Sequence, residues 1–391
     1  MTIDPSNPIA ATIHADPYPY YARLARETPV YHDDALGIWV VSSADTVTAA
    51  LTSPLCRVRP PGEPVPKALL GSAAGDVFRR LMRMNDGERH VPLKHAASDT
   101  LASVEPSRVE REGRRWARTL SMPLAAAWKP GLLTRFQFDL PVHVIGTLIG
   151  LPDDVLARLA RLVDAFVRCL APGSRPEEVE SGKVAAAELL VLFRAVVADD
   201  RVAASNTLLA TFARQAKRAG PVDLEAVAAN GIGLLFQTYE ATAGLIGNTL
   251  LALGRDAGLR DMVRDDPDAL RGVVGEVARL DPSIQNTRRW IATPGNVAGR
   301  GMAAGDAVLV LLAAANRDAS VNPDPDLFDP LRRDRRSFTF GIGDHACPGE
   351  RLATGIAVAG VEQVLASGSD LDLLARPISY HPSMNVRIPL L

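Results

Sequence analysis

The 391-residue chain has little cysteine and almost no surplus charge. Its three cysteines, Cys56, Cys169 and Cys347, are too far apart in the sequence for a Cys-x-x-Cys metal site, and their odd number argues against a disulfide framework. The 43 basic and 45 acidic side chains leave a net charge of −2. The chain therefore lacks the overall basic field that attracts nucleic acid, and we expect no nucleic-acid partner.

Long apolar runs are also missing. No stretch approaches the ~20 residues of a membrane span without polar or charged interruptions. Asp4 and Pro5 occupy the region where a secretory signal peptide has positive charge and an apolar core. We therefore expect a cytoplasmic protein that does not bind membranes. Apolar residues are nevertheless abundant, at 47% of the chain, as in a packed globular protein.

Helical periodicity dominates the middle of the chain. Apolar residues recur every three or four positions across much of 151–253. The longest predicted helix runs from Leu224 to about Arg255 and is apolar on nearly all sides, as expected of a helix through the centre of a domain. Short strands are predicted at 37–42 and 307–312. Nothing marks a domain boundary, so we expect residues 1–391 to form a single, mainly α domain with small peripheral β-sheets.

The segment 338–353, which reads FTFGIGDHACPGERLA, carries the chemistry. Gly341 and Gly343 permit a tight turn against something flat or bulky, and Pro348 suits the first turn of a following helix. A Cys347 thiolate there would face the positive end of that helix, which lowers the pKa of a thiol. Such a sulfur suits an axial ligand of haem iron. The alternative is that Cys347 is a small buried apolar residue.

This run resembles the haem-binding loop of the cytochrome P450 family at every fixed position of Phe-Gly-x-Gly-x-His-x-Cys-x-Gly. The resemblance extends from about Asp16 to the chain end, and it includes Glu276 and Arg279, which share a helix face at i and i+3. It implies the cytochrome P450 fold, with the long helix over a haem b (iron protoporphyrin IX) whose iron is bound by Cys347. It also implies that Glu276 and Arg279 form a buried structural ion pair, with Arg332 as a third partner.

Further haem contacts follow from the same resemblance. Phe340 and Gly341 would lie beside the porphyrin in the cysteine loop. The two propionates need cations or strong donors, and the family's positions for these are His90, Lys94, Arg289 and His345. The family more often has arginine where this chain has Lys94. The alternative for each of the four is an exposed polar side chain.

The long helix departs from the family pattern. Residues 236–243 read FQTYEATA, where the family usually has Ala-Gly-x-(Asp/Glu)-Thr, the acid and alcohol that organise water and protons at bound dioxygen. Glu240 keeps the acid, but Ala241 occupies the alcohol position. The proton would then come from the Thr238 hydroxyl, from Glu240 through water, or from the substrate. The alternative is a one-residue shift that gives the role to Thr242.

The predicted substrate pocket has a polar side. Gln237 would face the haem one turn before Ala241, either bonding the helix backbone or binding a substrate amide. The polar turn 283–287 has ordinary turn capping as its alternative. The missing alcohol and these polar groups favour a substrate that is aromatic and bears an amide. The predicted substrate contacts are Phe236, Gln237, Ala241, Ser283, Thr287 and Met384.

The resemblance therefore implies an O2-dependent oxidoreductase of bacterial secondary metabolism. We predict C–C or C–N coupling or cyclisation of a substrate such as a tryptophan-containing diketopiperazine, with hydroxylation of a macrolide, terpenoid or peptide as the alternative. A peroxide-dependent or non-oxidative haem enzyme is an alternative of another kind. Peroxygenases of the family tend to have an arginine near the iron on this helix, and none lies in 234–243. A haem sensor is less consistent with the complete cysteine loop.

Electrons would come from another protein. No glycine-rich phosphate-binding loop follows a predicted strand, so we expect a separate ferredoxin or flavodoxin with its reductase. Arg333, Arg335 and Arg336 precede the cysteine loop and would suit an acidic partner. The alternative for these arginines is a solvated surface.

Overall fold

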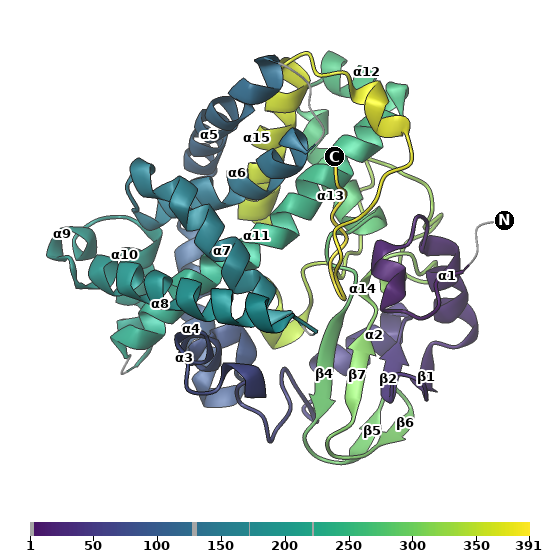
Figure 1. The fold of residues 1–391 in the computed structure, drawn as a ribbon. Helices are drawn as coiled ribbons and strands as arrows, with labels where there is room; N and C mark the ends of the chain where they lie inside the picture. The colour runs from purple at the N-terminus through teal and green to yellow at the C-terminus, as the bar shows by residue number, and fades with distance from the viewer. Residues whose placement is uncertain (1–3, 127–130, 172, 221–222) are drawn as a thin grey trace.

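In the computed structural model, which describes residues 4–126, 131–171, 173–220 and 223–391, helices make up most of the chain and a small sheet lies to one side (Figure 1). This confirms the predicted mainly α architecture with peripheral sheets. The helices are α1 (Tyr18–Glu27), α2 (Ala44–Thr52), α3 (Ala73–Arg80), α4 (Val91–Ala102), α5 (Pro106–Ala126), α6 (Leu132–Ile149), α7 (Leu156–Leu170), α8 (Pro176–Ala198), α9 (Asp200–Ala203), α10 (Leu208–Ala219), α11 (Leu224–Arg255), α12 (Ala257–Asp265), α13 (Ala269–Leu280), α14 (Leu312–Ala315) and α15 (Glu350–Ala366).

The larger sheet joins strands from both parts of the chain. Its order is β1-β2-β7-β4-β3, and the predicted strands at 37–42 and 307–312 are its parallel inner pair, β2 and β7. Val40 and Val308 are fully buried, which suits an inner pair covered on both faces. The strands are β1 (Val30–Asp33), β2 (Ile38–Val41), β3 (Cys56–Arg57), β4 (Thr287–Ile291) and β7 (Ala307–Val310), and β5 (Gly295–Val297) pairs separately with β6 (Arg300–Met302).

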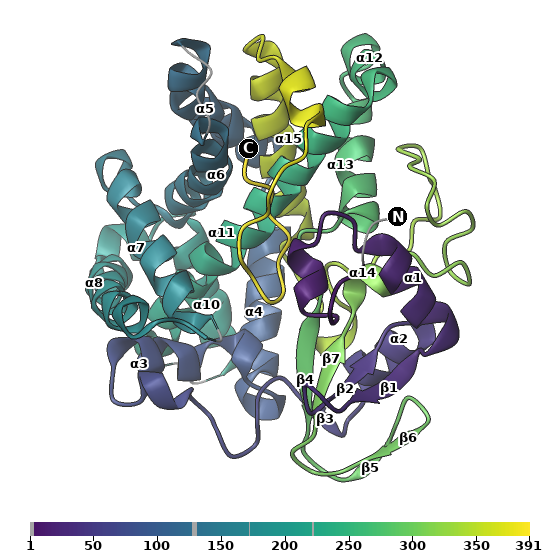
Figure 2. The same cartoon turned by 45° about the vertical axis from the view of Figure 1, so that its right-hand side comes forward.

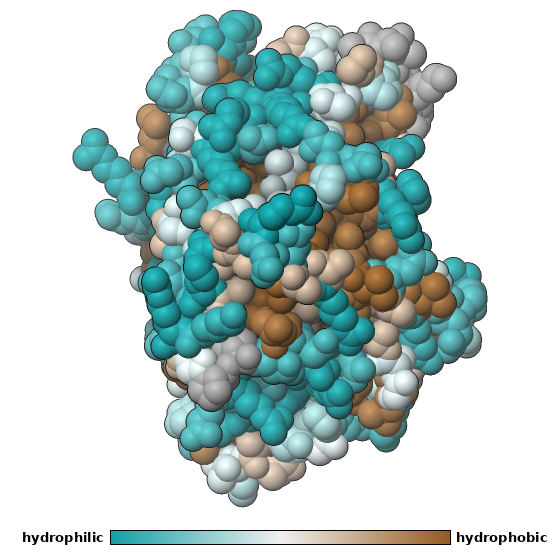
Figure 3. Space-filling model, turned by 90° about the vertical axis from the view of Figure 1, so that its left-hand side faces the viewer, coloured by the Kyte–Doolittle hydropathy of each residue, from teal (hydrophilic) through white to brown (hydrophobic). Residues whose placement is uncertain are grey.

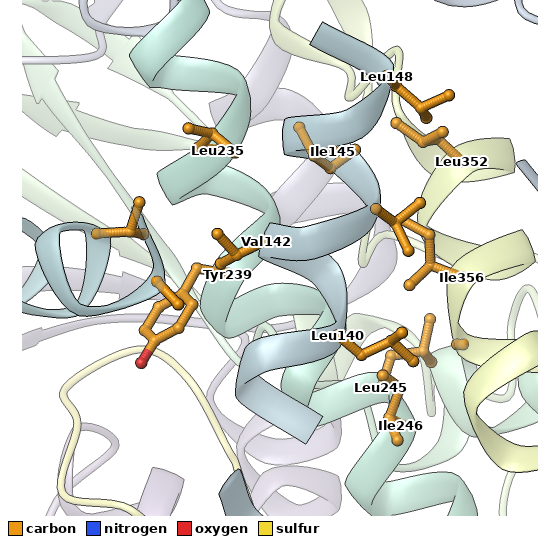
Figure 4. Packing of buried hydrophobic residues seen from close by; sticks show 14 of the residues in the cluster. Leu140, Val142, Ile145, Leu148, Leu235, Tyr239, Leu245, Ile246, Leu352 and Ile356 are labelled. Carbon is orange, nitrogen blue, oxygen red and sulfur yellow. The ribbon is translucent and has the colours of Figure 1, made fainter. Parts of the chain in front are cut away.

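The long helix α11 runs through the middle of the molecule and contacts α6, α8 and α15 (Figure 1). It begins after Asp223, whose side chain accepts a hydrogen bond from the Glu225 N–H. Full burial of one Leu or Ile side chain stabilises the fold by ~1.5–3 kcal/mol, so this packing holds α11 firmly. Figure 4 shows the packing of α11 with α6 and α15. The labelled residues are Leu235, Tyr239, Leu245 and Ile246 of α11, Leu140, Val142, Ile145 and Leu148 of α6, and Leu352 and Ile356 of α15.

The C-terminal segment returns to the middle of the molecule and lies against α11 (Figure 2). A Cβ added at Gly244 would lie 2.5 Å from the Ser283 Cβ and 2.9 Å from the Arg387 carbonyl oxygen. Any larger residue at 244 would therefore push the turn after α13 and the C-terminal segment away from α11. This close approach fixes turn 283–287 and the C-terminal segment, two of the predicted walls of the substrate pocket, against α11.

Buried charges hold α13 to the segment that leads into the cysteine loop. Glu276 and Arg279 are fully buried, and Arg279 Nη2 donates to Glu276 Oε1 at 2.6 Å. Arg332 Nε lies 3.4 Å from the same oxygen, which confirms the predicted third partner. The expectation that Arg335 faces an acidic partner protein is wrong, because its Nε donates to Glu276 Oε2 at 2.8 Å. Burial disfavours the carboxylate, but hydrogen bonds from Arg279 and Arg335 hold the Glu276 pKa below its usual value.

Figure 3 shows one face of the molecule, on which apolar side chains gather near the middle and polar side chains surround them. Within the described residues, no helix combines the length and apolar character needed to cross a membrane.

Candidate haem-binding site

The cysteine loop is a compact turn that ends at the start of α15. Gly341 and Gly343 have φ of 68° and 69°, a left-handed conformation that glycine adopts without strain. The Cys347 N–H donates to the Phe340 carbonyl oxygen at 2.6 Å, which closes the turn. The Gly349 N–H donates to the Cys347 Sγ at 3.3 Å. Phe340, Gly341 and Cys347 are therefore part of one rigid loop.

The Cys347 sulfur is accessible, but the protein around it shifts the pKa of its thiol. Cys347 has substantial accessible surface, yet enough protein surrounds it for burial to raise the pKa of its thiol. The Gly349 hydrogen bond and the Lys94 charge act in the opposite direction but do not outweigh burial. The pKa lowering that we expected from the helix end is thus wrong for the protein chain alone. A metal cation bound to the sulfur would supply the missing positive charge.

Four predicted propionate partners gather beside this loop. The His90 ring stacks on His345, with centroids 4.0 Å apart, and His90 Nε2 lies 3.1 Å from the Asp344 carbonyl oxygen. Lys94 Nζ contacts the Ala346 carbonyl oxygen. His345 Nε2 lies 3.2 Å from Asp86 Oδ1. Burial lowers the pKa values of Lys94 and His345, which shows that both groups are partly withdrawn from water.

Arg289 lacks a carboxylate partner. Its side chain leaves β4, is only 7% exposed and donates to the Arg288 carbonyl oxygen at 2.9 Å. Across the described residues, no acidic group lies within ion-pair distance of it. Burial lowers the pKa of Arg289, so an anion at this position would relieve a desolvated charge. The residues present therefore fit a haem, because they offer a cysteine sulfur fixed by its loop and a buried cation without an anion among the described residues.

Two side chains on α11 bond to the helix backbone. Gln237 Nε2 donates to the Gly233 carbonyl oxygen at 2.8 Å, and Thr238 Oγ1 donates to the Leu234 carbonyl oxygen at 2.7 Å. Of the two roles considered for Gln237, the structure shows the hydrogen bond to the helix backbone. Ala241 is partly exposed, whereas the Thr242 hydroxyl is fully buried and has no hydrogen-bond partner among the described residues.

Glu240 has an environment that favours its neutral form. Burial and the negative charge of Asp164 raise its pKa to about 7, against the opposing charges of Arg83 and Arg168. Asp164, on α7, accepts a hydrogen bond from the Tyr239 hydroxyl at 3.0 Å and lies 3.0 Å from Arg168 Nε. Glu240 is thus a titratable group near neutral pH, and its charge is linked to residues on α7.

The predicted pocket walls are held by their own hydrogen bonds. Phe236 packs edge-on against Phe166 with ring centroids 5.4 Å apart. The Ser283 carbonyl oxygen accepts from the Arg387 N–H at 2.7 Å, and Asn286 Nδ2 donates to the Met384 carbonyl oxygen at 2.9 Å. Much of the polarity of turn 283–287 therefore serves to bind the C-terminal segment. Thr287 begins β4 and is partly exposed, as is Met384.

Arg83, which lies in the short turn η3 (Met82–Met84), was not predicted as a site residue from the sequence. Its side chain has accessible surface, yet burial lowers its pKa, while the charges of Cys347 and Glu240 raise it. Arg83 is therefore close enough to Cys347 in the cysteine loop and to Glu240 on α11 for both charges to act on it. No local pattern around Arg83 signals this position, because it depends on how η3 packs against α11.

A family model described as "Cytochrome P450" matches residues 207–365. Cytochrome P450 monooxygenase PikC of Streptomyces venezuelae is 28% identical over 95% of this chain and 89% of its own length. C-19 steroid 1alpha-hydroxylase of Sorangium cellulosum is 30% identical over 67% of this chain and 68% of its own. The structure of P450BioI in complex with hexadec-9Z-enoic acid ligated acyl carrier protein has a TM-score of 0.81 at 22% identity, covering 95% of this chain and 96% of that one.

These similarities define a P450 fold built around a cysteine loop. The chain belongs to the cytochrome P450 family. Its relatives include named monooxygenases and hydroxylases, and the chain is a cytochrome P450 oxidoreductase of the monooxygenase type. Membership of this family implies a haem whose iron has a cysteine thiolate ligand.

Proposed function

We propose that residues 1–391 form one haem-thiolate oxidase domain that holds haem b through Cys347. Its reaction is O2-dependent C–C or C–N coupling of an aromatic, amide-bearing secondary metabolite, such as a tryptophan-containing diketopiperazine. The observation that carries the proposal is the geometry of the cysteine loop: the Cys347 sulfur accepts a hydrogen bond from the Gly349 N–H, and His90, Lys94 and His345 lie beside the loop.

Residues of this chain account for the binding of the cofactor. Bound haem supplies an iron that binds O2 and activates it once two electrons arrive. Cys347 ligates this iron, and the Gly349 N–H withdraws some electron density from the sulfur by its hydrogen bond. The propionates are neutralised by the partly desolvated cations and imidazoles beside the loop, namely His90, Lys94, Arg289 and His345.

Of the candidate proton sources in the chain, Glu240 is the best supported. The Thr238 hydroxyl donates its proton to the Leu234 carbonyl oxygen, so it is not free to donate toward the site. Ala241 has no hydroxyl. Glu240, with a pKa raised to about 7, carries its proton in about half of the molecules at neutral pH. We therefore assign proton delivery to Glu240, directly or through a water.

Ala241 is what favours coupling over hydroxylation. Coupling removes two hydrogens from the substrate as the new bond forms, and these, with two electrons and two protons, reduce O2 to two waters. Hydroxylation instead leaves one oxygen atom in the product and one in water. The hydrogen bonds of turn 283–287 to the C-terminal segment weaken polarity as an argument for an amide-bearing substrate but do not remove it, because Gln285 Oε1 is buried and has no hydrogen-bond partner among the described residues. Hydroxylation of a macrolide, terpenoid or peptide is the runner-up, supported by the named hydroxylase among the relatives.

Turnover with a surrogate electron supply tests this proposal. The holoenzyme receives ferredoxin, ferredoxin reductase, NADPH and O2 with a panel of tryptophan-containing cyclic dipeptides, macrolides and terpenoids, and products are analysed by mass spectrometry. Coupling gives products that have lost two hydrogens and gained no oxygen, whereas hydroxylation adds one oxygen. Cys347→His is the inactive control. Oxygen-containing products alone would refute coupling and leave hydroxylation.

Arg83 favours a second candidate function. Family peroxygenases have an arginine near the iron, and the absence of one in 234–243 counted against this function. Arg83, from η3, is a guanidinium on which the charges of Cys347 and Glu240 act. Hydrogen peroxide would then replace O2, both electrons and both protons. Product formation with peroxide alone, at a rate equal to or above that with the ferredoxin system, would favour this function.

We further infer that ferredoxin or flavodoxin, with its reductase, is the electron donor. Arg335 is committed to Glu276, so it is not a docking residue. Arg333 and Arg336 are exposed and remain candidates for contact with an acidic partner.

A further inference from the structure

Arg83 extends from a turn that is fixed to both walls of the site. The Met82 N–H donates to Asn230 Oδ1 of α11 at 2.8 Å, and His90 Nδ1 lies 2.9 Å from the Met82 carbonyl oxygen. The other ring nitrogen of His90 lies 3.1 Å from the carbonyl oxygen of Asp344 in the cysteine loop. The backbone at Arg83 is therefore placed relative to α11 on one side and to the cysteine loop on the other.

The same turn packs on the face of α11 that carries Gln237. A Cβ added at Gly233 would lie 3.0 Å from both Leu81 Cδ2 and Gln237 Nε2. Asn230 Nδ2 also donates to the Arg80 carbonyl oxygen at 2.9 Å, so the chain on the approach to Arg83 follows α11 closely. Gln237 is one helical turn before Ala241, and the Arg83 side chain thus starts beside the α11 side of the site.

Arg83 carries a charge that the chain does not neutralise. Its guanidinium makes no hydrogen bond or ion pair with any residue in the described ranges. The two negative groups that act on it are Cys347, whose charge an iron would share, and Glu240, which is neutral in about half of the molecules near pH 7. Beside these two groups the Arg83 guanidinium has no lasting partner, and a carboxylate is the group that matches its planar donors.

The haem propionates are assigned to other residues in the proposed function. His90, His345 and Lys94 lie beside the cysteine loop, and the charge of Arg289 acts on His345. The charges that act on Lys94 come from Cys347 and Asp344, whereas those that act on Arg83 come from Cys347 and Glu240. Arg83 therefore differs from those residues in facing the acid on α11.

We propose that Arg83 binds a carboxylate group of the substrate on the α11 side of the haem. This inference rests on the proposed haem-thiolate function and narrows its substrate class to organic acids. A cyclic dipeptide would then qualify only with an acidic side chain. Arg83 becomes a specificity-determining residue, because an uncharged analogue of the substrate would leave the guanidinium without a partner.

The test uses probes that bind the iron whatever the natural substrate is. Imidazolyl-butanoate, -hexanoate and -octanoate, and their methyl esters, are titrated into the ferric holoenzyme, and the Soret shift on imidazole coordination gives each Kd. For at least one chain length, the wild type binds the acid about tenfold or more tightly than the ester. Arg83→Gln abolishes this ratio, and Arg83→Lys retains part of it. Arg89→Gln, which removes an exposed arginine of the adjacent turn, leaves the ratio unchanged.

Two results would overturn the inference. The first is a wild type that prefers no acid at any chain length, and the second is a ratio that survives in Arg83→Gln. In the second case, faster haem transfer from Arg83→Gln to apomyoglobin would make Arg83 a propionate ligand. The carbon monoxide spectrum tests the proposed function separately: a normal thiolate band without acid preference removes only the inference. Circular dichroism of Arg83→Gln shows whether the variant is folded.

Discussion

The Gly349 N–H donates a hydrogen bond to the Cys347 sulfur at 3.3 Å, at the point where the cysteine loop becomes α15. This contact fixes the direction of the sulfur and reduces its electron donation. The donor is a backbone N–H, so this hydrogen bond depends on the turn that Gly341 and Gly343 allow and not on any side chain. The tight loop and the ligand chemistry are therefore parts of the same local sequence.

The first prediction concerns this sulfur. The reduced, carbon monoxide-bound holoenzyme should show the red-shifted Soret band of thiolate ligation, and Cys347→His should abolish that band. Cys169→Ala is the matched control, because Cys169 is buried between α7 and α8 and burial raises its thiol pKa to about 11. A wild type without the band, or a Cys169→Ala variant that loses it, would show that the ligand has been wrongly assigned.

The second prediction concerns pH. Glu240 has a pKa raised to about 7, so it is protonated below that pH and charged above it. If it delivers the proton, product formed per NADPH falls as pH rises through about 7, and Glu240→Gln removes this dependence. Because the charged form of Glu240 is disfavoured in the folded protein, the free energy of unfolding should also fall as pH rises from the pKa of the unfolded state, near 4.5, toward 7.

Asp164 provides the control for that assignment. Its charge helps to raise the Glu240 pKa, so Asp164→Asn should move the midpoint of the pH profile to lower pH without removing it. A midpoint that is the same in wild type, Asp164→Asn and Glu240→Gln would mean that another group titrates.

The sequence allowed the fold to be predicted where local patterns suffice. The bounds of α11 follow from an uninterrupted apolar periodicity, and the pairing of Glu276 with Arg279 follows from helical spacing and family resemblance. Arg335 was assigned to a docking surface instead, because nothing in its local sequence separates an exposed arginine from one that turns inward to Glu276. That difference is decided by tertiary packing.

The site was predictable to the same extent. The cysteine loop is one continuous segment, so its glycines and Cys347 could be read together. Arg83 could not be predicted, because its position depends on the hydrogen bond from Met82 to Asn230, which joins segments far apart in the chain. The direction of the pKa shift of the Cys347 thiol was also misjudged, because burial outweighs the hydrogen bond from the Gly349 N–H.

The third prediction restores the missing alcohol. Ala241→Thr should lower the fraction of electrons that are lost as hydrogen peroxide, because a hydroxyl one residue from Glu240 can pass on its proton. Thr238→Ala is the control and should leave the fraction unchanged, since the Thr238 hydroxyl already donates to the Leu234 carbonyl oxygen. The measurement compares NADPH consumed with peroxide and product formed. An unchanged peroxide fraction in Ala241→Thr would mean that position 241 is outside the proton path.

The fourth prediction concerns the ion pairs of Glu276. Arg279→Ala should lower the free energy of unfolding by ~3–5 kcal/mol, because it leaves a fully buried carboxylate without its main partner. Arg335→Ala should cost about 1–3 kcal/mol, since Arg279 and Arg332 remain in place. Denaturant unfolding of each holoenzyme measures the change. Equal losses in the two variants would contradict the ranking.

The last prediction separates Arg333 from Arg335 on the segment before the cysteine loop. Arg333 is exposed, so Arg333→Ala should change stability by less than ~0.5 kcal/mol. If an acidic ferredoxin docks here, the same variant slows reduction of the haem, and the difference from wild type shrinks as salt rises. Stopped-flow reduction under carbon monoxide, at low and high salt, measures this rate. Arg264→Ala, on α12, removes another exposed arginine and is the control for net charge. Equal slowing in both variants would indicate a general charge effect, and the docking surface would then have to be sought elsewhere.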